Sequence, residues 1–287
     1  MQNDTGPFPR LAIVGFGLIG GSIALSAKRR WPATAVVAVD DKAVVDAALT
    51  SGAADQASDD LAILAGADLV VLAAPVLQNI AILERLPAVL RGSTLVTDVG
   101  STKRRIVAAA DQVPAVPFIG GHPMAGAARG GLAAARADLF DRHPWIVTPS
   151  PDDTSWLERL DAFITGLGAI PHIMTADLHD RLVAAVSHLP QVTASALMHV
   201  VGKLAGDAGL ELAGPGLVDT TRLAASPAQI WRDIAATNDD MLREALDALI
   251  RTLTDLRNGL GNAESIDATF TSATRWRDAL LRARGDA

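Results

Sequence analysis

The sequence predicts an α/β fold in which a doubly wound, mostly parallel sheet is followed by an all-helical domain. Short apolar runs alternate with helical segments through the first half of the chain, as expected for a parallel sheet covered by helices. The first run ends in closely spaced glycines at a strand-to-helix turn. Beyond residue 175 the periodicity is helical almost throughout. We therefore expect two domains, residues 1–150 and 151–287, with the first reaching residue 174 if a last strand joins the sheet.

The first domain is organised around the stretch from Leu11 to Ser22. Its four leading residues are apolar and typical of a buried strand. The next apolar side chains recur at helical spacing, at Ile19, Ile23 and Ala27. The glycines lie between strand and helix: Gly15 permits a tight turn, Gly17 lets a pyrophosphate approach the backbone, and Gly20 lets the helix pack closely on the strand. The phosphates would face the positive end of the helix dipole.

A second apolar strand, residues 35–39, ends in Asp40. An acidic residue at this place accepts hydrogen bonds from the adenosine ribose of a dinucleotide. Strand, glycines, helix and acid together predict a Rossmann-type dinucleotide site, although turn glycines and a loop acid would also account for each part alone. Asp41 would repel the extra phosphate of NADP, so NAD is favoured, while Lys42 keeps NADP open as the alternative. The expected cofactor-binding residues are Gly15, Phe16, Gly17, Leu18, Ile19, Gly20, Asp40 and Pro75.

Further apolar runs are expected to complete the sheet. They are residues 68–75, 93–98, 118–122 and 144–149, with 168–174 as a plausible last strand. Alanine-rich residues 43–51 predict a helix, and another helix is expected to begin near Arg104. Ligands of such sheets lie outside the carboxyl ends of the strands, so the chemistry should be sought there.

The second half predicts a helical bundle. We expect one long helix from Ala176 to about Leu204, bent at Pro190 because proline cannot donate to the carbonyl of Val186 and crowds it. Residues 228–259 and 265–284 predict two further helices, each with an apolar stripe. These apolar faces indicate a homodimer formed through the helical domain, with a monomeric bundle as the alternative.

Composition narrows the class of protein. The 287 residues, 49% of them hydrophobic and 20% charged, suffice for about two globular domains. The net charge of −7 argues against a nucleic-acid partner, because phosphate contacts need a basic face. Without cysteine there is no thiol nucleophile or Cys-ligated zinc, and no metal site is expected. No apolar run approaches about 18 residues and no secretory signal is evident, so we expect no membrane partner and a cytoplasmic location.

Reactive side chains follow two of the expected strands. Ser101 and Lys103 follow the fourth run and His122 ends the fifth, so neighbouring loops could bring Ser101 and His122 together. A histidine here can take the proton of a hydroxyl as the same carbon gives up hydride, and the serine hydroxyl could bridge the two. A nucleophilic Ser-His pair is a weaker alternative, because no acid partner or nucleophile elbow is present.

Several further segments stand out besides the glycine turn. They are residues 98–103 (DVGSTK), 120–126 (GGHPMAG), 179–180 (HD), 187–190 (SHLP) and 221–226 (TRLAAS), with Trp231 and Asn238. Together these segments resemble the prephenate/arogenate dehydrogenase family of tyrosine biosynthesis. They follow the family's order over about residues 10–280 and are jointly specific, although each alone is weak.

The resemblance implies oxidative decarboxylation of a small cyclohexadienol. Hydride would leave C4 for NAD, carbon dioxide would leave C1, and the ring would become aromatic. By this likeness His122 accepts the proton of the C4 hydroxyl, Ser101 supports that contact, and Arg222 binds a substrate carboxylate with its guanidinium fork. The helical domain would be an intertwined dimer interface.

The likeness also places three residues of the helical domain near the substrate: Ser187, His188 and Gln191. For His188, a buried histidine that stabilises the helix bend is an equal alternative. Trp231 and Asn238 lie seven residues apart on one helix face and could support Arg222, with core packing as the alternative for the tryptophan.

The chain departs from prephenate-using relatives at three positions. Gln191 stands where they commonly have a second histidine, and Ala128 and Val218 stand where they often carry an acid and a lysine. Gln191 never offers a positive charge to a pyruvyl carboxylate, and arogenate, whose side chain bears an ammonium, suffers less from that absence. Arogenate, or the use of both substrates, is thus slightly favoured, with prephenate as the alternative.

Three other functions stay open on the sequence alone. The first is dehydrogenation of an amino-substituted prephenate analogue. The second is that of a short β-hydroxyacid dehydrogenase, although such enzymes normally use a helix-borne lysine and Lys203 is the only lysine after residue 150. The third is a non-catalytic NAD-binding sensor, which the intact set of Ser101, His122 and Arg222 disfavours.

Overall fold

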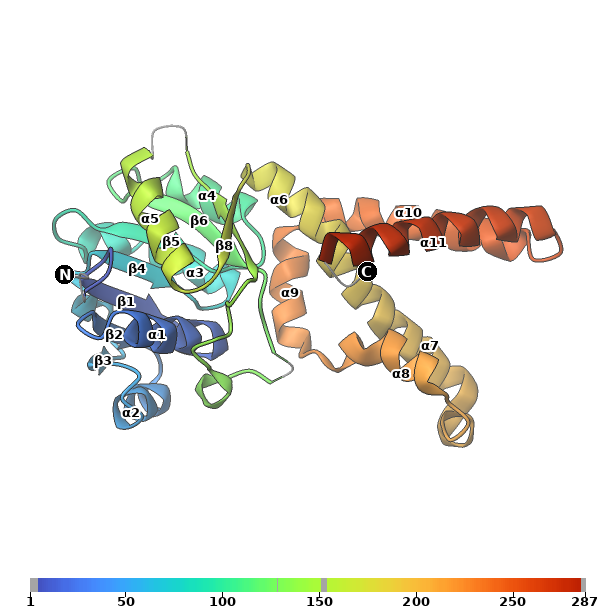
Figure 1. The fold of residues 1–287 in the computed structure, drawn as a ribbon, viewed down its shortest axis with the longest axis horizontal. Helices are drawn as coiled ribbons and strands as arrows, with labels where there is room; N and C mark the ends of the chain where they lie inside the picture. The colour runs from blue at the N-terminus through green and yellow to red at the C-terminus, as the bar shows by residue number, and fades with distance from the viewer. Residues whose placement is uncertain (1–4, 128, 151–153, 285–287) are drawn as a thin grey trace. The chain divides into compact units, whose positions relative to one another are not determined.

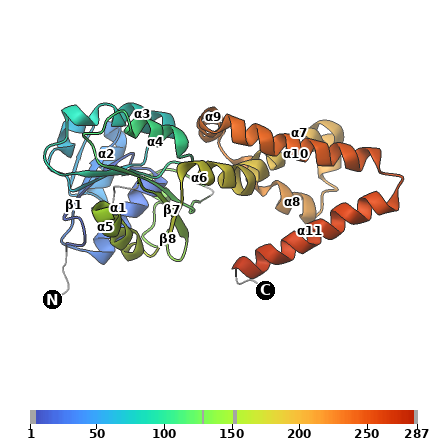
Figure 2. The same cartoon turned by 90° about the horizontal axis from the view of Figure 1, so that it is seen from above.

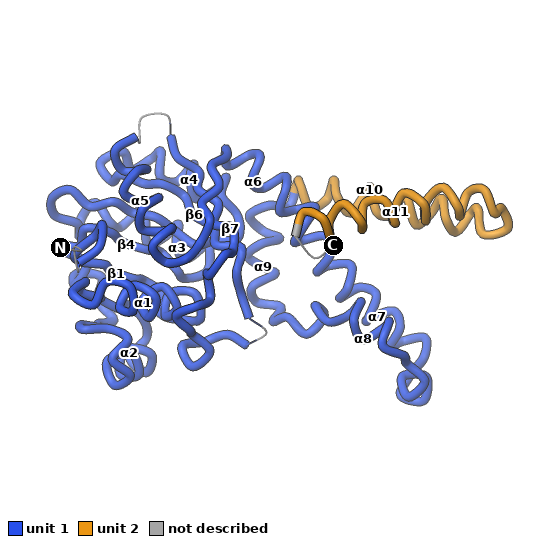
Figure 3. Tube along the Cα trace, viewed as in Figure 1, with its two compact units in different colours: residues 1–239 blue, residues 240–287 orange. Residues whose placement is uncertain are grey.

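The computed structural model describes residues 5–127, 129–150 and 154–284. The chain divides into two compact units, residues 1–239 and residues 240–287, shown in different colours in Figure 3. The first unit contains the sheet and every strand named below. In the parts of the chain that the structure describes, no helix is both long and apolar enough to cross a membrane.

An eight-stranded sheet forms the centre of the first unit (Figure 1). Its strands are β1 (Arg10–Val14), β2 (Ala35–Val39), β3 (Gln56–Ser58), β4 (Leu69–Leu72), β5 (Leu95–Asp98), β6 (Phe118–Pro123), β7 (Pro144–Thr148) and β8 (Ile170–Ile173). The order is β3-β2-β1-β4-β5-β6-β7-β8. The first six strands are parallel, and β7 pairs antiparallel with β6 and parallel with β8. This is the doubly wound order of dinucleotide-binding domains, so the predicted fold class is confirmed.

Both faces of the sheet are covered by helices. Along β1, Leu11 and Ile13 belong to one buried cluster and Ala12 and Val14 to another, because successive side chains of a strand point to opposite faces. Figure 2 shows α1 and α5 on one face and α3 and α4 on the other. The helices of this part are α1 (Leu18–Arg30), α2 (Lys42–Thr50), α3 (Val76–Leu83), α4 (Arg104–Ala110) and α5 (Thr154–Gly166). Burial on both faces explains why the central strands β1, β2 and β4 are almost continuously apolar.

The glycine turn between β1 and α1 has the geometry that its sequence predicts. Gly15 has φ +91°, a left-handed conformation that favours glycine, and a Cβ there would collide with the backbone of Ala73 and Ala74. A Cβ on Gly20 would collide with the carbonyl oxygen of Gly15 and lie 2.9 Å from Cγ2 of Ile13. The absence of side chains therefore lets α1 start directly against the ends of β1 and β4.

The chain is mostly helical after Thr175, whose Oγ1 accepts a hydrogen bond from the backbone N of Leu178 at 3.2 Å. The elements are α6 (Ala176–Val183), a π-helical turn (Ala184–His188), α7 (Leu189–Leu210), α8 (Pro215–Thr221), a 3₁₀ turn (Arg222–Ala225) and α9 (Ala228–Thr237). The predicted single helix, bent at Pro190, is instead divided by the π turn, which ends at His188, two residues before the proline. The wider turn accommodates a residue that donates no backbone hydrogen bond.

One predicted helix is divided in two. The expected helix over residues 228–259 breaks at Asn238, where φ is −143° and ψ is 37°, and continues as α10 (Asp239–Asn258). The second unit consists of the rest of α10 and of α11 (Ala263–Arg284), which confirms the predicted last helix. Both helices carry large exposed apolar side chains: Ile250, Leu253, Phe270, Trp276 and Leu280.

Candidate active site

Two adjoining clefts lie at the carboxyl ends of the parallel strands, where the sequence predicts a ligand. They share residues 73–75, which follow β4. The first, of about 460 Å³, opens over the glycine turn and the end of β2. The second, of about 490 Å³, opens over the end of β5 and α9. Two linked clefts at the point where the strand order reverses suit the two halves of a dinucleotide.

The first cleft fits the adenosine end of such a molecule. The carboxylate of Asp40 lines it and accepts hydrogen bonds from the backbone N of Phe16 at 2.6 Å and of Asp41 at 2.7 Å. Each carboxylate oxygen keeps a further lone pair for a ribose hydroxyl. A Cβ on Gly17 would meet nothing within 4 Å, so the N-terminus of α1 faces open space. The residues present therefore fit a dinucleotide.

The other predicted cofactor residues divide between the core and the clefts. The Phe16 side chain is fully buried, so only its backbone is near the cleft, and Leu18 packs against the same core. Gly20 lies in the helix–strand contact, Ile19 lines the second cleft, and Pro75 lines both.

Ser101 lines the second cleft from the sheet side, close in the sequence to Val99. On the α9 side the lining includes Gln229, Ile230 and Asp233. These α9 residues were not predicted, because nothing in the sequence places that helix against the end of β5. Ser101 thus lies in the cleft that adjoins the one over the glycine turn.

His122, near the end of β6, begins a chain of three buried side chains. Its Nδ1 lies 2.8 Å from Nε2 of His179, and Nδ1 of His179 lies 2.7 Å from Oδ1 of Asp180. Because a carboxylate only accepts, His179 carries its proton on Nδ1 and accepts the Nδ1–H of His122 at Nε2. The remaining lone pair of His122 therefore lies on Nε2, which is the atom left to accept a proton.

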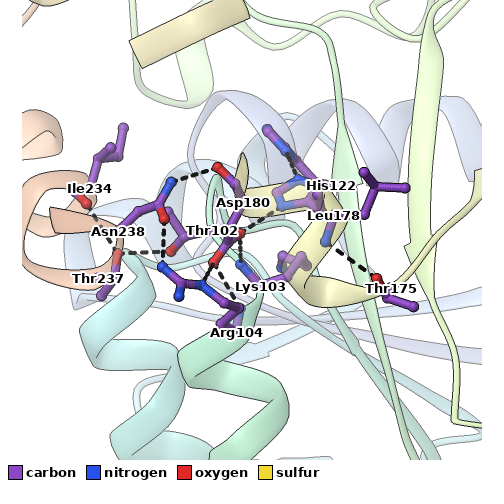
Figure 4. A network of polar contacts seen from close by, with 12 residues as sticks. Thr102, Lys103, Arg104, His122, Thr175, Leu178, Asp180, Ile234, Thr237 and Asn238 are labelled. Carbon is purple, nitrogen blue, oxygen red and sulfur yellow. Dashed lines mark hydrogen bonds and ion pairs between the residues drawn. The ribbon is translucent and has the colours of Figure 1, made fainter. Parts of the chain in front are cut away.

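The start of α4 fixes Asp180. Its carboxylate accepts from the backbone N of Lys103 at 2.7 Å and of Arg104 at 3.0 Å, and from Nε of Arg104 at 3.3 Å. Figure 4 shows Asp180 between these residues and Asn238. Burial alone would raise the pKa of Asp180, but hydrogen bonds from His179 and from these two backbone N–H groups lower it below its usual value. The carboxylate therefore stays charged and keeps the histidines in one tautomeric arrangement.

A buried ion pair joins the ends of β5 and β6 beside His122. Nζ of Lys103 bonds Oδ2 of Asp98 and also donates to the carbonyl of Gly121 at 2.8 Å. Asp98 accepts further from the backbone N of Gly100 at 2.8 Å and of Gly121 at 3.1 Å. Burial lowers the pKa of Lys103, and the charge of Asp98 opposes that change. The pair holds the backbone directly before His122.

The surroundings keep His122 neutral. Burial, followed by the nearby His179, Lys103 and His188, holds the pKa of His122 well below its ordinary value of 6.5. At neutral pH the imidazole is therefore in the form that can act as a general base.

His188 ends the π turn and is buried with its ring edge-on to Trp231, the ring centroids 5.9 Å apart. Burial lowers the pKa of His188 to about 4. Asn238 accepts from Nη2 of Arg104 at 2.9 Å and donates to the backbone O of Asp180 at 2.8 Å. Trp231 thus packs against His188, and Asn238 bonds Arg104 and Asp180.

The structure does not bring all the predicted site residues into contact. Among the residues that the structure describes, the hydrogen bond of the His122 ring goes to His179 and not to Ser101. Arg222 is an exposed residue that begins the 3₁₀ turn, and it does not line the cleft that contains Ser101. Ser187 is half-buried in the π turn.

The positions at which the chain departs from prephenate-using relatives are also located in part. Gln191 is buried and bonded to the backbone O of Leu223 and to Ser226. Val218 is exposed on α8, and Ala128 lies outside the described residues. Within the described ranges, no three His, Asp or Glu side chains are grouped as metal ligands.

Comparison with known proteins identifies two family domains in this chain. Residues 23–172 match the family domain described as prephenate dehydrogenase, nucleotide-binding domain, and residues 175–270 match prephenate dehydrogenase, dimerization domain. The prephenate dehydrogenase of Bacillus subtilis (strain 168) is 36% identical over 96% of this chain and 77% of its own length.

Solved structures show the same likeness. The arogenate dehydrogenase of Synechocystis has a TM-score of 0.81 at 30% identity, covering 94% of this chain and 99% of the other. The prephenate dehydrogenase of A. aeolicus, in complex with hydroxyphenyl propionate and NAD+, has a TM-score of 0.87 at 26% identity, covering 94% of this chain and 98% of the other. With both family domains matched in order over most of its length, this chain belongs to the prephenate dehydrogenase family.

Proposed function

We propose that this chain catalyses the NAD-linked oxidative decarboxylation of a cyclohexadienol, arogenate or prephenate. The observation that carries the proposal is the chain from His122 through His179 to Asp180, which leaves Nε2 of a buried, neutral imidazole as the proton acceptor. The names of the relatives support it, since one is an arogenate dehydrogenase and another was solved with NAD+. Arogenate and prephenate, the substrates in the two names, are both cyclohexadienols.

The chemistry needs one base and careful positioning. Bound NAD supplies the acceptor for the hydride that leaves C4 of the ring. Nε2 of His122 takes the proton of the C4 hydroxyl, the electrons of the bond between C1 and its carboxylate enter the ring as carbon dioxide leaves, and His122 returns the proton to the phenol oxygen. The imidazole thus ends as it began. Aromatisation favours the reaction, so the protein chiefly orients the reacting groups.

The remaining predicted residues take supporting roles in this proposal. Ser101 would hydrogen-bond the hydroxyl beside His122, and its place in the second cleft supports this. Arg222 would bind a substrate carboxylate, with Ser187 and His188 near the same substrate. Asp40 would bind the adenosine ribose, and Asp41, which also lines the first cleft, would disfavour the extra phosphate of NADP.

The chain is also proposed to work as a homodimer through its helical domain. The match of residues 175–270 to a dimerization domain supports this arrangement. The pairing of β8 with β7 supports a nucleotide-binding domain that extends to about residue 174 rather than ending at residue 150.

A two-substrate assay tests the function. NADH formation is followed by absorbance with prephenate and with arogenate, and kcat/KM is compared. We expect activity with at least one substrate and a slight preference for arogenate. A prephenate preference above about tenfold, worth roughly 1.4 kcal/mol, contradicts the expected preference. No turnover with either substrate despite measurable NAD binding would instead indicate a sensor.

The variant His122→Asn tests the assigned base. It should lower kcat by roughly 10²–10⁴-fold, the usual contribution of general-base catalysis, while the Kd for NAD stays unchanged. Titration of the variant with NAD provides the control. Retained turnover would show that another group handles the proton and would shift the assignment to a β-hydroxyacid-type dehydrogenase.

A further inference from the structure

Gln191, near the start of α7, uses both ends of its amide within the protein. Nε2 donates to the backbone O of Leu223 at 2.7 Å and, more weakly, to Oγ of Ser195 at 3.3 Å. Oε1 accepts from Oγ of Ser226 at 3.0 Å. The residue is 5% exposed, so these contacts satisfy polar atoms that water reaches poorly. One side chain thus bonds Leu223 within the 3₁₀ turn Arg222–Ala225 and Ser226, the residue that directly follows the turn.

Leu223 and Ser226, both bonded by Gln191, follow Arg222 within four positions of the chain. Leu223 directly follows it, and Ser226 closes the turn that Arg222 begins, with its backbone N donating to the backbone O of Leu223 at 3.1 Å. Arg222 itself is exposed, and the structure shows no hydrogen bond of its guanidinium among the described residues. Its location therefore depends on how well the turn is held.

We propose that Gln191 is a positioning residue that fixes the turn and so sets where the guanidinium of Arg222 meets the substrate carboxylate. The family resemblance places Gln191 near the substrate, whereas in the structure its amide donor and acceptor bond Leu223 and Ser226. The inference rests on the proposed function, in which Arg222 binds that carboxylate. A held turn leaves less conformational entropy to lose on binding, which strengthens binding without a new contact.

The amide is chemically suited to this task. A primary amide offers a donor and an acceptor on one planar group, as the carbonyl of Leu223 and the hydroxyl of Ser226 require. Glutamate at this position would place a second acceptor against the Leu223 carbonyl. Methionine has nearly the same length and neither capacity, which makes Gln191→Met the sharpest substitution.

The experiment measures steady-state kinetics of three single variants. Gln191→Met loses both bonds to the turn and should raise KM for the cyclohexadienol by roughly tenfold or more, with KM for NAD unchanged and kcat altered less. Ser226→Ala loses one bond and should raise the same KM about threefold to fivefold. Ser195→Ala removes only the long contact within α7 and serves as the matched control, with unchanged kinetics.

A double-mutant cycle with Arg222→Ala separates positioning from direct binding and from a merely structural role. If Gln191 acts through Arg222, Gln191→Met has little further effect on KM when Arg222 is already alanine. Equal effects in both backgrounds, or an unchanged KM in Ser226→Ala, would overturn the proposal while leaving the proposed function intact. An unchanged KM in Arg222→Ala alone would instead refute the carboxylate role of Arg222, and the positioning role with it.

Discussion

At the scale of single residues, the chemistry depends on which nitrogen of His122 is free. The carboxylate of Asp180 fixes the tautomer of His179, and His179 fixes that of His122, so each contact determines the next. The same burial that makes these hydrogen bonds specific also disfavours a charged imidazole. Geometry and protonation state thus come from the same arrangement.

The pH dependence of kcat/KM should show that His122 stays neutral at and below pH 6.5. Because the pKa of His122 in the folded protein lies well below 6.5, the base form persists as the pH falls through 6.5. We expect kcat/KM to stay level across that range and to decline only at lower pH. Below pH 6.5 the unfolded chain binds protons that the folded one excludes, which destabilises the fold, so each sample is also re-assayed at neutral pH to detect unfolding. An acid limb centred at or above 6.5 would contradict the arrangement.

Residues whose roles depend on short sequence spacing could be predicted, and those that depend on distant partners could not. Gly15 and Asp40 function through the turn between adjacent strands, which spacing defines. His179 and Asp180 were visible only as a motif, because the contact of His179 with His122 spans 57 positions along the chain. The engagement of Gln191 by Leu223 and Ser226 likewise needs a turn that no residue pattern placed against α7.

At the scale of elements, the strands were predictable because burial on both faces makes them continuous apolar runs. β3 was missed, since it has three residues and sits at the edge of the sheet. The break at Asn238 was also missed, because neither glycine nor proline marks it. Its side chain bonds Arg104 and the backbone of Asp180, so tertiary contacts rather than local preference accompany the end of α9 there.

The buried ion pair between Lys103 and Asp98, which joins the ends of β5 and β6, allows a prediction about the stability of the fold. Lys103 and Asp98 are both 0% exposed, so Lys103→Met leaves an unpaired carboxylate in the interior. Such a loss typically costs about 3–5 kcal/mol of unfolding free energy. Urea unfolding measures the change, with Lys42→Met as the control because its pair with Asp46 is exposed and worth under about 1 kcal/mol. Equal loss in both variants would show that burial of the pair is unimportant.

At the scale of the whole molecule, large apolar side chains remain exposed on both α10 and α11. Leu253 on α10 is 55% exposed and Phe270 on α11 is 64% exposed, although both are large and apolar. Large apolar patches that stay exposed are uncommon on monomers and typical of association surfaces. The proposed homodimer would bury these side chains through the helical domain.

The combined variant Leu253→Asp and Phe270→Asp should therefore be monomeric. Two carboxylates introduced into an apolar interface would lose their hydration without a counter-charge, which opposes association strongly. Light scattering should give twice the mass of the chain for the native protein and the mass of one chain for the variant. Leu49→Asp is the matched control, since Leu49 is also apolar and 43% exposed but lies on α2 of the nucleotide-binding part. Dissociation by Leu49→Asp, or a variant that keeps the native mass, would show that the interface lies elsewhere.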